Sequence, residues 1–188
     1  MPSHKQPLQF HLPKKKVIGN TAMAERETFY LVCDTSGSMA EGGKRMLMRG
    51  IARTVEQCIR LGDGAAEIKL VLWNTTAAVA DWEPSDELPA QLLECGGSSN
   101  ASALIKTLGE KPDGNVLFLT DGWWSEDEKK VLKKWRKSLP SETLRIIKIG
   151  ADANPLLKGD DVFAAEDIIT ALDGWLKPAS TDGADSWD

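Results

Sequence analysis

Two polar stretches of the sequence carry side-chain oxygens at a spacing that suits a metal ion. The first, DTSGS, holds Asp34, Ser36 and Ser38 and directly follows the apolar run FYLVC. The second begins at Asp121, directly after the run VLFLT. Carboxylate and hydroxyl oxygens suit a hard divalent cation such as Mg²⁺, whereas zinc sites favour thiolates and imidazoles. If the hydroxyls bind directly and the carboxylates act partly through water, the cation keeps much of its positive charge and attracts an external anion.

A third loop, GGSSN at residues 96–100, offers two more hydroxyls, those of Ser98 and Ser99. It precedes the apolar segment 101–108, which reads as a short helix. Three separate loops could therefore deliver two carboxylates and several hydroxyls to one place, provided that the fold brings the loops together.

The elements between these loops predict such a fold. Short apolar runs typical of strands covered on both faces alternate with amphipathic helical patterns, of which residues 44–61 form the longest. Ser125 followed by Glu128 is a capping box that opens another helix, and Pro140 ends it. This alternation predicts an α/β protein with a doubly wound, mostly parallel central sheet and helices on both faces, in which the carboxyl ends of the strands meet at a ligand-binding crevice. The expected strands are 29–33, 68–73, 116–120 and 144–149, and a closing helix is expected at 166–176.

The three loops together resemble a known family. The motif D-x-S-x-S, the loop GGSSNASAL and the strand end LFLTDG are similar to those of a von Willebrand factor type A (vWA) domain with a metal-ion-dependent adhesion site, of the small intracellular bacterial type. The likeness extends over about residues 27–177. It includes the stretch IIKIGADANPLLKGDDVF, which resembles the late strand, short helix and final strand of the family.

The resemblance implies a role for each residue of the site. Ser36 and Ser38 would bind the cation directly, and Asp34 and Asp121 would bind it directly or hold coordinated waters. The second loop would supply one further hydroxyl, for which most members of the family use threonine. The aligned residue here is Ser98, and Ser99 is the alternative one position later. The cation would be Mg²⁺ or Mn²⁺, with Ca²⁺ less well suited if the oxygens are set for a smaller ion.

The chain of 188 residues suits one domain. We expect a basic, disordered tail at residues 1–24, the vWA domain at 25–177 and a second disordered tail at 178–188. A net charge of −5 argues against nucleic-acid binding, because a phosphate-binding surface needs clustered cations. Three cysteines, no secretory leader pattern and no membrane-spanning apolar run favour a cytoplasmic location without contact with a membrane.

Two surface features of the sequence extend beyond the metal motif. Trp123 and Trp124 follow Asp121 closely, and neighbouring side chains diverge, so at least one indole should lie exposed at the rim of the crevice as a partner-binding residue. The following helix has an acidic first turn and six cations later, at 129, 130, 133, 134, 136 and 137. This distribution complements the helix dipole, and the alternative is a basic strip that steers an acidic partner.

The sequence favours a protein without enzymatic activity. The only histidines, His4 and His11, lie in the N-terminal tail, and neither a nucleophile elbow nor a phosphate-binding P-loop is present. An aspartyl-phosphate enzyme of the haloacid dehalogenase type would resemble D-x-D, but the third position here is Ser36. A metal-assisted hydrolase is the enzymatic alternative that remains.

We therefore predict a module that binds a partner protein through the cation, which an Asp or Glu carboxylate of the partner would complete. The resemblance implies an accessory subunit of a bacterial multi-protein system, which works with an AAA+ ATPase or with a kinase or phosphatase in stress response or defence. The alternative is a metal-independent scaffold that docks through the Trp123 and Trp124 rim or the basic helix. A nucleic-acid role for the lysine-rich tail ranks third.

Overall fold

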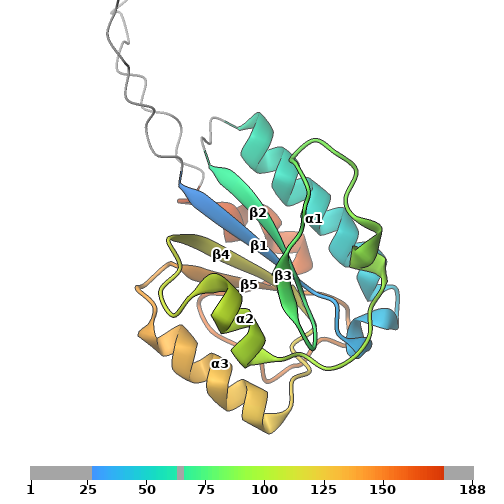
Figure 1. Ribbon diagram of the computed structural model, residues 1–188, viewed down its shortest axis with the longest axis vertical. Helices are drawn as coiled ribbons and strands as arrows, with labels where there is room; N and C mark the ends of the chain where they lie inside the picture. The colour runs from blue at the N-terminus through green and yellow to red at the C-terminus, as the bar shows by residue number, and fades with distance from the viewer. Residues whose placement is uncertain (1–26, 63–65, 176–188) are drawn as a thin grey trace, which may run out of the picture.

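The computed structural model describes residues 27–62 and 66–175 and contains one central sheet (Figure 1). The predicted tails at 1–24 and 178–188 lie outside the described residues. The strand order is β3-β2-β1-β4-β5-β6, in which only β3 runs antiparallel to its neighbour. The strands are β1 Thr28–Asp34, β2 Glu67–Trp73, β3 Ala77–Val79, β4 Gly114–Thr120, β5 Leu144–Lys148 and β6 Val162–Ala164.

Helices cover both faces of this sheet, as the sequence predicts. In Figure 1, α2 and α3 lie on one side of the strands, and α4 lies behind them. α1 and α4 pack on one hydrophobic core and α2 and α3 on another. The helices are α1 Lys44–Leu61, α2 Ala101–Leu108, α3 Glu126–Ser138 and α4 Ile168–Leu172, with 3-10 turns at Gly37–Ala40, Ala90–Leu93 and Ala165–Asp167.

Strand β1 is the centre of the molecule, since every one of its residues is buried. It pairs in parallel with β2 on one side and β4 on the other, so that Leu31 lies beside both Leu70 and Leu117. Alternate residues face opposite cores: Leu31 packs under α1, and Val32 packs under α2 and α3. Each such side chain contributes roughly 1.5–3 kcal/mol on burial. A strand buried on both faces needs a continuous apolar run, whereas a half-exposed strand would alternate apolar and polar residues.

Side chains cap the N-termini of α2 and α3, and one side chain of α3 also caps α2. The Asn100 side chain accepts a hydrogen bond from the Ala103 N–H (3.0 Å), and Ser125 Oγ accepts one from the Glu128 N–H (3.3 Å). The Ser125 cap of the predicted capping box is thus present. The Glu128 carboxylate, however, accepts from the Ala101 N–H (2.5 Å), at the start of the other helix. It satisfies an otherwise free donor of α2 and couples the two helices.

Two predictions about the C-terminal third are wrong. No helix forms in the segment 149–161 between β5 and β6; instead Gly150 and Asn154 open tight turns closed by the N–H groups of Ala153 and Leu157. Pro155 cannot donate a backbone hydrogen bond. The closing helix is also shorter than predicted: α4 covers Ile168–Leu172 and follows a 3-10 turn, and Gly174 with φ +76° reverses the chain soon after it.

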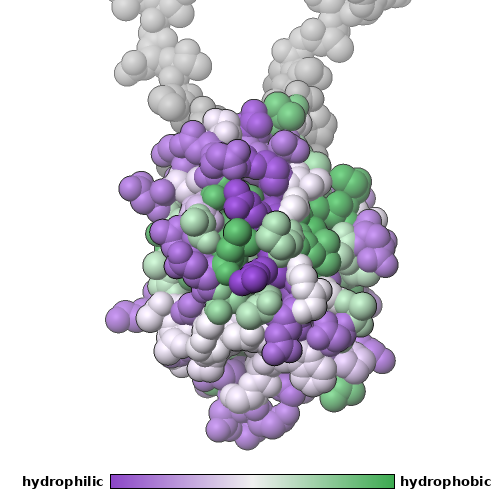
Figure 2. Space-filling view, turned by 90° about the vertical axis from the view of Figure 1, so that its right-hand side faces the viewer, coloured by the Kyte–Doolittle hydropathy of each residue, from purple (hydrophilic) through white to green (hydrophobic). Residues whose placement is uncertain are grey.

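The surface over α1 mixes both kinds of side chain. Figure 2 shows the side that lies on the right in Figure 1, where hydrophobic residues lie in small groups among hydrophilic ones. Met46, Leu47 and Leu61 of α1 are exposed. None of the described helices combines the length and the apolar character that a membrane crossing requires.

A buried carboxylate in α1 supplies the first testable prediction. Glu56 is fully buried and pairs with Arg53 (3.3 Å) and Arg60, and it accepts the Ser85 N–H (3.1 Å). Burial opposes ionisation, but the hydrogen bonds from Arg60 and Arg53 outweigh it and lower the pKa of Glu56. Its contribution to stability is therefore present above the ordinary glutamate pKa of about 4.3 and is lost as the pH falls through the lowered folded-state value.

Glu56→Ala should lower the free energy of unfolding by roughly 2–3 kcal/mol at pH 7, because two guanidinium groups and a backbone donor lose their partner. The difference from the wild type should shrink as the pH falls below 4. Urea unfolding at several pH values measures both effects. Gln57→Ala, a change at the neighbouring exposed position, is the control. A pH-independent difference would contradict the assigned role of the charge.

Candidate metal centre

The candidate site lies where the strand order reverses. β1 leads to α1 on one face of the sheet, whereas its neighbour β4 leads to α3 on the other face. The chain therefore diverges between the two strand ends and leaves a crevice, which is where doubly wound sheets bind ligands. Asp34 is the last residue of β1, and Asp121 directly follows β4.

Asp34 is held by three donors at the bottom of this crevice. Its Oδ1 accepts the Ser36 N–H (2.9 Å), and its Oδ2 accepts Thr120 Oγ1 (2.7 Å) and, more weakly, Trp124 Nε1 (3.4 Å). Only 1% of Asp34 is exposed. This burial raises the pKa of the Asp34 carboxyl, against the opposing effect of the hydrogen bonds from Ser36 and Thr120. The donors fix the orientation of the carboxylate.

Asp121 connects the two serines of the first loop to the interior. Its Oδ1 accepts hydrogen bonds from Ser38 Oγ (3.1 Å) and the Trp123 N–H (3.2 Å), and Ser38 Oγ lies 3.3 Å from Ser36 Oγ. The structure thus joins Asp34, Ser36, Ser38 and Asp121 in one chain of contacts. These four residues were named from the sequence as candidate ligands.

A lysine that the sequence analysis did not single out completes the group. Lys44 Nζ donates to Asp121 Oδ2 (2.8 Å) and to Asp152 Oδ2 (3.1 Å), and only 3% of Lys44 is exposed. Burial disfavours the ammonium, but the hydrogen bonds to Asp121 and Asp152 outweigh it and raise the pKa of Lys44. The hydrogen bond from Lys44 to Asp152 also lowers the pKa of the Asp152 carboxyl.

The position of Lys44 is built into the fold. A Cβ at Gly150 would lie 2.7 Å from Lys44 Cγ, so only glycine lets the chain pass this close to the lysine stem. A signal in the sequence could have found it: Lys44 lies four residues before Met48 and seven before Ile51, on the apolar stripe of α1. A cation on the buried face of an amphipathic helix requires a buried anion, and Asp121 provides it.

Backbone hydrogen bonds join the second loop to the first. The Gly96 N–H donates to the Thr35 carbonyl (2.9 Å), and the Gly37 N–H donates to the Gly97 carbonyl (2.9 Å). These bonds bring the loop that carries Ser98 and Ser99 against the DTSGS loop.

The two serines of the second loop differ in their surroundings. Ser98 is exposed, and its N–H donates to Thr75 Oγ1 (3.3 Å). Ser99 is buried, and its Oγ is the one buried side-chain polar atom within residues 27–62 and 66–175 that lacks a hydrogen-bond partner. An unpaired buried hydroxyl is costly, and the free oxygen of Ser99 is therefore suited to bind a cation.

The spacing of the candidate ligand oxygens fits a small divalent cation. Neighbouring ligands of an octahedral Mg²⁺ site lie about 2.9 Å apart, given metal–oxygen distances of about 2.0–2.1 Å. The Ser36–Ser38 and Ser38–Asp121 oxygen distances of 3.3 and 3.1 Å approach this edge length. Among the described residues, no three His, Cys, Asp or Glu side chains form a metal-binding group, so hydroxyls must carry much of any coordination.

The two tryptophans diverge, as predicted. Trp123 is 50% exposed and donates through Nε1 to the Asp152 carbonyl (2.9 Å). Trp124 is partly buried and packs against Trp73, with ring centroids 6.0 Å apart. One indole therefore lies at the rim, and the other supports Asp34 from below.

Comparison of whole structures identifies the fold. The manganese-loaded TRAP protein of Plasmodium vivax superposes with a TM-score of 0.58 at 13% sequence identity, over 82% of this chain and 75% of that one. The fold is that of a vWA domain. No family model and no curated protein matches the sequence.

Two other solved structures superpose on this chain with lower TM-scores. Proximal thread matrix protein 1 from the mussel byssus, in a form with a zinc-occupied adhesion site, has a TM-score of 0.47 at 14% identity, over 78% of this chain and 45% of that one. An aerotolerance-related membrane protein from Bacteroides fragilis has a TM-score of 0.45 at 13% identity, over 72% and 75% of the two chains.

The pairing of Lys44 with Asp121 yields the second prediction. Lys44→Met keeps the length of the stem but leaves the Asp121 carboxylate buried without a counter-charge. We expect a loss of about 3 kcal/mol of unfolding free energy in the presence of EDTA. Mg²⁺ should restore more stability to the variant than to the wild-type protein, because the ion can supply the missing positive charge.

Thermal and urea unfolding with EDTA or with millimolar Mg²⁺ measure both effects. Lys106→Met, at an exposed position without an ion pair in the described chain, controls for the change of net charge. Equal stability of Lys44→Met and Lys106→Met in EDTA would contradict the role of Lys44 as the counter-ion of Asp121.

Proposed function

We propose that this vWA domain is a metal-dependent protein-interaction module. The observation that carries the proposal is the contact chain of carboxylates and hydroxyls, Asp34, Ser36, Ser38 and Asp121, with the unpaired Ser99 hydroxyl on the loop held against it. These groups come from three loops at the switch point of the sheet. Such an all-oxygen set serves a hard cation and has no evident purpose in packing.

The cation in this proposal is Mg²⁺ or Mn²⁺, with Ca²⁺ less suited. Asp34, Ser36, Ser38, Asp121 and Ser99 would hold it, and Ser98 is the alternative to Ser99. The closely spaced oxygens favour a small ion. The similar TRAP protein is manganese-loaded in its crystal structure, which supports this choice. The bound ion would supply a Lewis-acidic position for an anion from outside.

The anion would be an Asp or Glu carboxylate of a partner protein. Because the Lys44 ammonium offsets the charge of Asp121, a divalent cation at the site would keep enough positive charge to accept another acid. Trp123 stands half exposed beside Asp121 and would add apolar contact area at little entropic cost. We assign the protein to the bacterial cytoplasm, as an accessory subunit for an AAA+ ATPase or for a kinase or phosphatase in a stress or defence system.

Binding without catalysis is part of the same proposal. None of the residues in the described ranges is a histidine, and the Lys44 amine is held in two ion pairs. Asp34 is fixed by donors beneath the crevice. We therefore find no candidate for a general base beside the cluster, which favours a recognition role over a hydrolase.

One observation favours a second candidate function, a metal-independent scaffold that docks through the Trp123 and Trp124 rim or the basic helix α3. Lys44 neutralises Asp121 without any metal, as the ammonium of a degenerate site would. The two functions differ in one measurable property, since only the metal-dependent module loses its partner when a chelator is added.

The proposal predicts saturable binding of Mg²⁺ and Mn²⁺ to chelator-stripped protein by isothermal titration calorimetry. Asp34→Asn keeps the shape of the side chain and should weaken this binding at least tenfold, because the charge that anchors the coordination shell is removed. Acetate at millimolar concentration should tighten it by completing the shell. Asp86→Asn, at an exposed position, is the control. Absence of binding with and without acetate would leave only the scaffold function.

Titration of the second-loop variants distinguishes Ser99 from Ser98. Ser99→Ala should weaken Mg²⁺ binding about tenfold and, without metal, should not destabilise the domain, because it removes an unpaired buried hydroxyl. Ser98→Ala should leave the affinity unchanged. Ser99→Thr should bind Mg²⁺ as the wild type does, because threonine keeps the hydroxyl oxygen. The reverse pattern would make Ser98 the ligand.

A further inference from the structure

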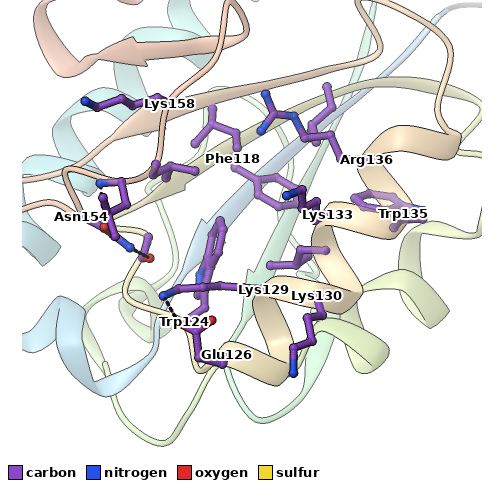
Figure 3. Close-up of a pocket in the computed structure, with 16 residues that line it drawn as sticks. Phe118, Trp124, Glu126, Lys129, Lys130, Lys133, Trp135, Arg136, Asn154 and Lys158 are labelled. Carbon is purple, nitrogen blue, oxygen red and sulfur yellow. Dashed lines mark hydrogen bonds and ion pairs between the residues drawn. The ribbon is translucent and has the colours of Figure 1, made fainter.

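A cavity of about 460 Å³ lies between α3 and the sheet, beside the candidate metal centre and facing away from α1. Figure 3 shows Phe118 and Trp124 in its interior, with Trp135 set into α3 behind it. The remaining apolar lining comes from Leu144 and Ile146 of β5, Leu132 of α3, and Leu156 and Leu157 of the β5–β6 segment. The volume and lining are those of a binding pocket.

The cavity exists because the connection from β5 to β6 contains no helix. A right-handed crossover between these parallel strands passes over the face that carries α3. Turns take the place of a helix there, so part of the sheet stays uncovered. The edge is ordered nonetheless: Asn154 Nδ2 donates to the Gly122 carbonyl (2.9 Å), and Asn154 Oδ1 accepts the Leu156 N–H (2.9 Å).

Cations surround this apolar interior. Lys129, Lys130 and Arg136 of α3 line the cavity, but each already pairs with an acid, Glu126, Asp127 and Asp161 respectively. Two further cations line the cavity without an ion pair in the described part of the chain: Lys133 on α3, and Lys158 on the turn segment. In Figure 3, Lys158 comes from the coil across the cavity from α3 and its ammonium points outward, so the two unpaired cations stand at opposite edges of the cavity.

This arrangement selects the chemistry of a ligand. The aromatic interior accepts one large apolar group, and the unpaired ammonium groups on either side accept an anion each. The cations at positions 129, 133 and 136 follow one another along the helix over about 10 Å, at a rise of 1.5 Å per residue. A linear ligand with acids on both sides of an apolar side chain matches this spacing better than a compact anion does.

We propose that the cavity between α3 and the β5–β6 segment binds an acidic peptide segment of a partner protein, with one large apolar side chain inserted between Lys133 and Lys158. This site is separate from the proposed metal function. Neither lysine touches Asp34, Ser36, Ser38 or Asp121 in the structure. The peptide should therefore bind equally well with EDTA and with Mg²⁺.

The test uses the full chain and the fluorescein-labelled peptide GDDFDDG, with binding followed by fluorescence anisotropy in EDTA. Two matched peptides, GNNFNNG and GDDADDG, remove the charges and the aromatic ring separately, and each should bind at least tenfold more weakly. Lys133→Glu should weaken GDDFDDG binding at least tenfold. Lys134→Glu makes the same charge change at the next position, which does not line the cavity, and should have less than a twofold effect.

Other outcomes would overturn the proposal. Equal losses in Lys133→Glu and Lys134→Glu would reduce the binding to nonspecific attraction, and the absence of saturable binding would exclude the site. Binding that requires Mg²⁺ and disappears in Asp34→Asn would assign the peptide acids to the metal centre. Binding that is seen only after removal of residues 178–188 would make that acidic segment of this chain, with its Trp187, the occupant in place of a partner.

Discussion

The bond between Lys44 and Asp121 is the constraint on which the rest of the site depends. It joins the first residue of α1 to the end of β4 in a region with almost no solvent, and a second bond from Lys44 holds Asp152 of the turn segment. Two carboxylates, those of Asp121 and Asp152, share this single ammonium. The lysine thus balances the buried charge of Asp121 and holds the loops together without a metal ion.

Much of this molecule follows from its sequence. Strands buried on both faces must be continuous apolar runs, and the runs around Leu31 and Leu117 are; α1 begins and ends where its apolar stripe does. Once the strands are parallel, their carboxyl ends share an edge, and the pairing of β1 with β4 then brings Asp34 and Asp121 together. The capping residue Ser125 is equally local, because its bond reaches only three residues along the chain.

Other features depend on contacts that the sequence does not reveal. The ion pair of Lys44 joins residues 77 positions apart, and the difference between exposed Ser98 and buried Ser99 depends on how one loop rests on another. The stretch between β5 and β6 is as long as a helical connection, but Pro155 and the turns at Gly150 and Asn154 prevent one. The three-residue strand β3 is too short to show a period.

Trp124 contributes both to the candidate metal centre and to the cavity beside α3. One edge of its indole donates to Asp34 beneath the candidate metal centre, and the ring also lines the cavity beside α3. The two sites thus share a wall one side chain thick. A change of side-chain size at Trp124 would therefore alter the cavity and the support of Asp34 together, so that the shape of one surface is coupled to the carboxylate of the other.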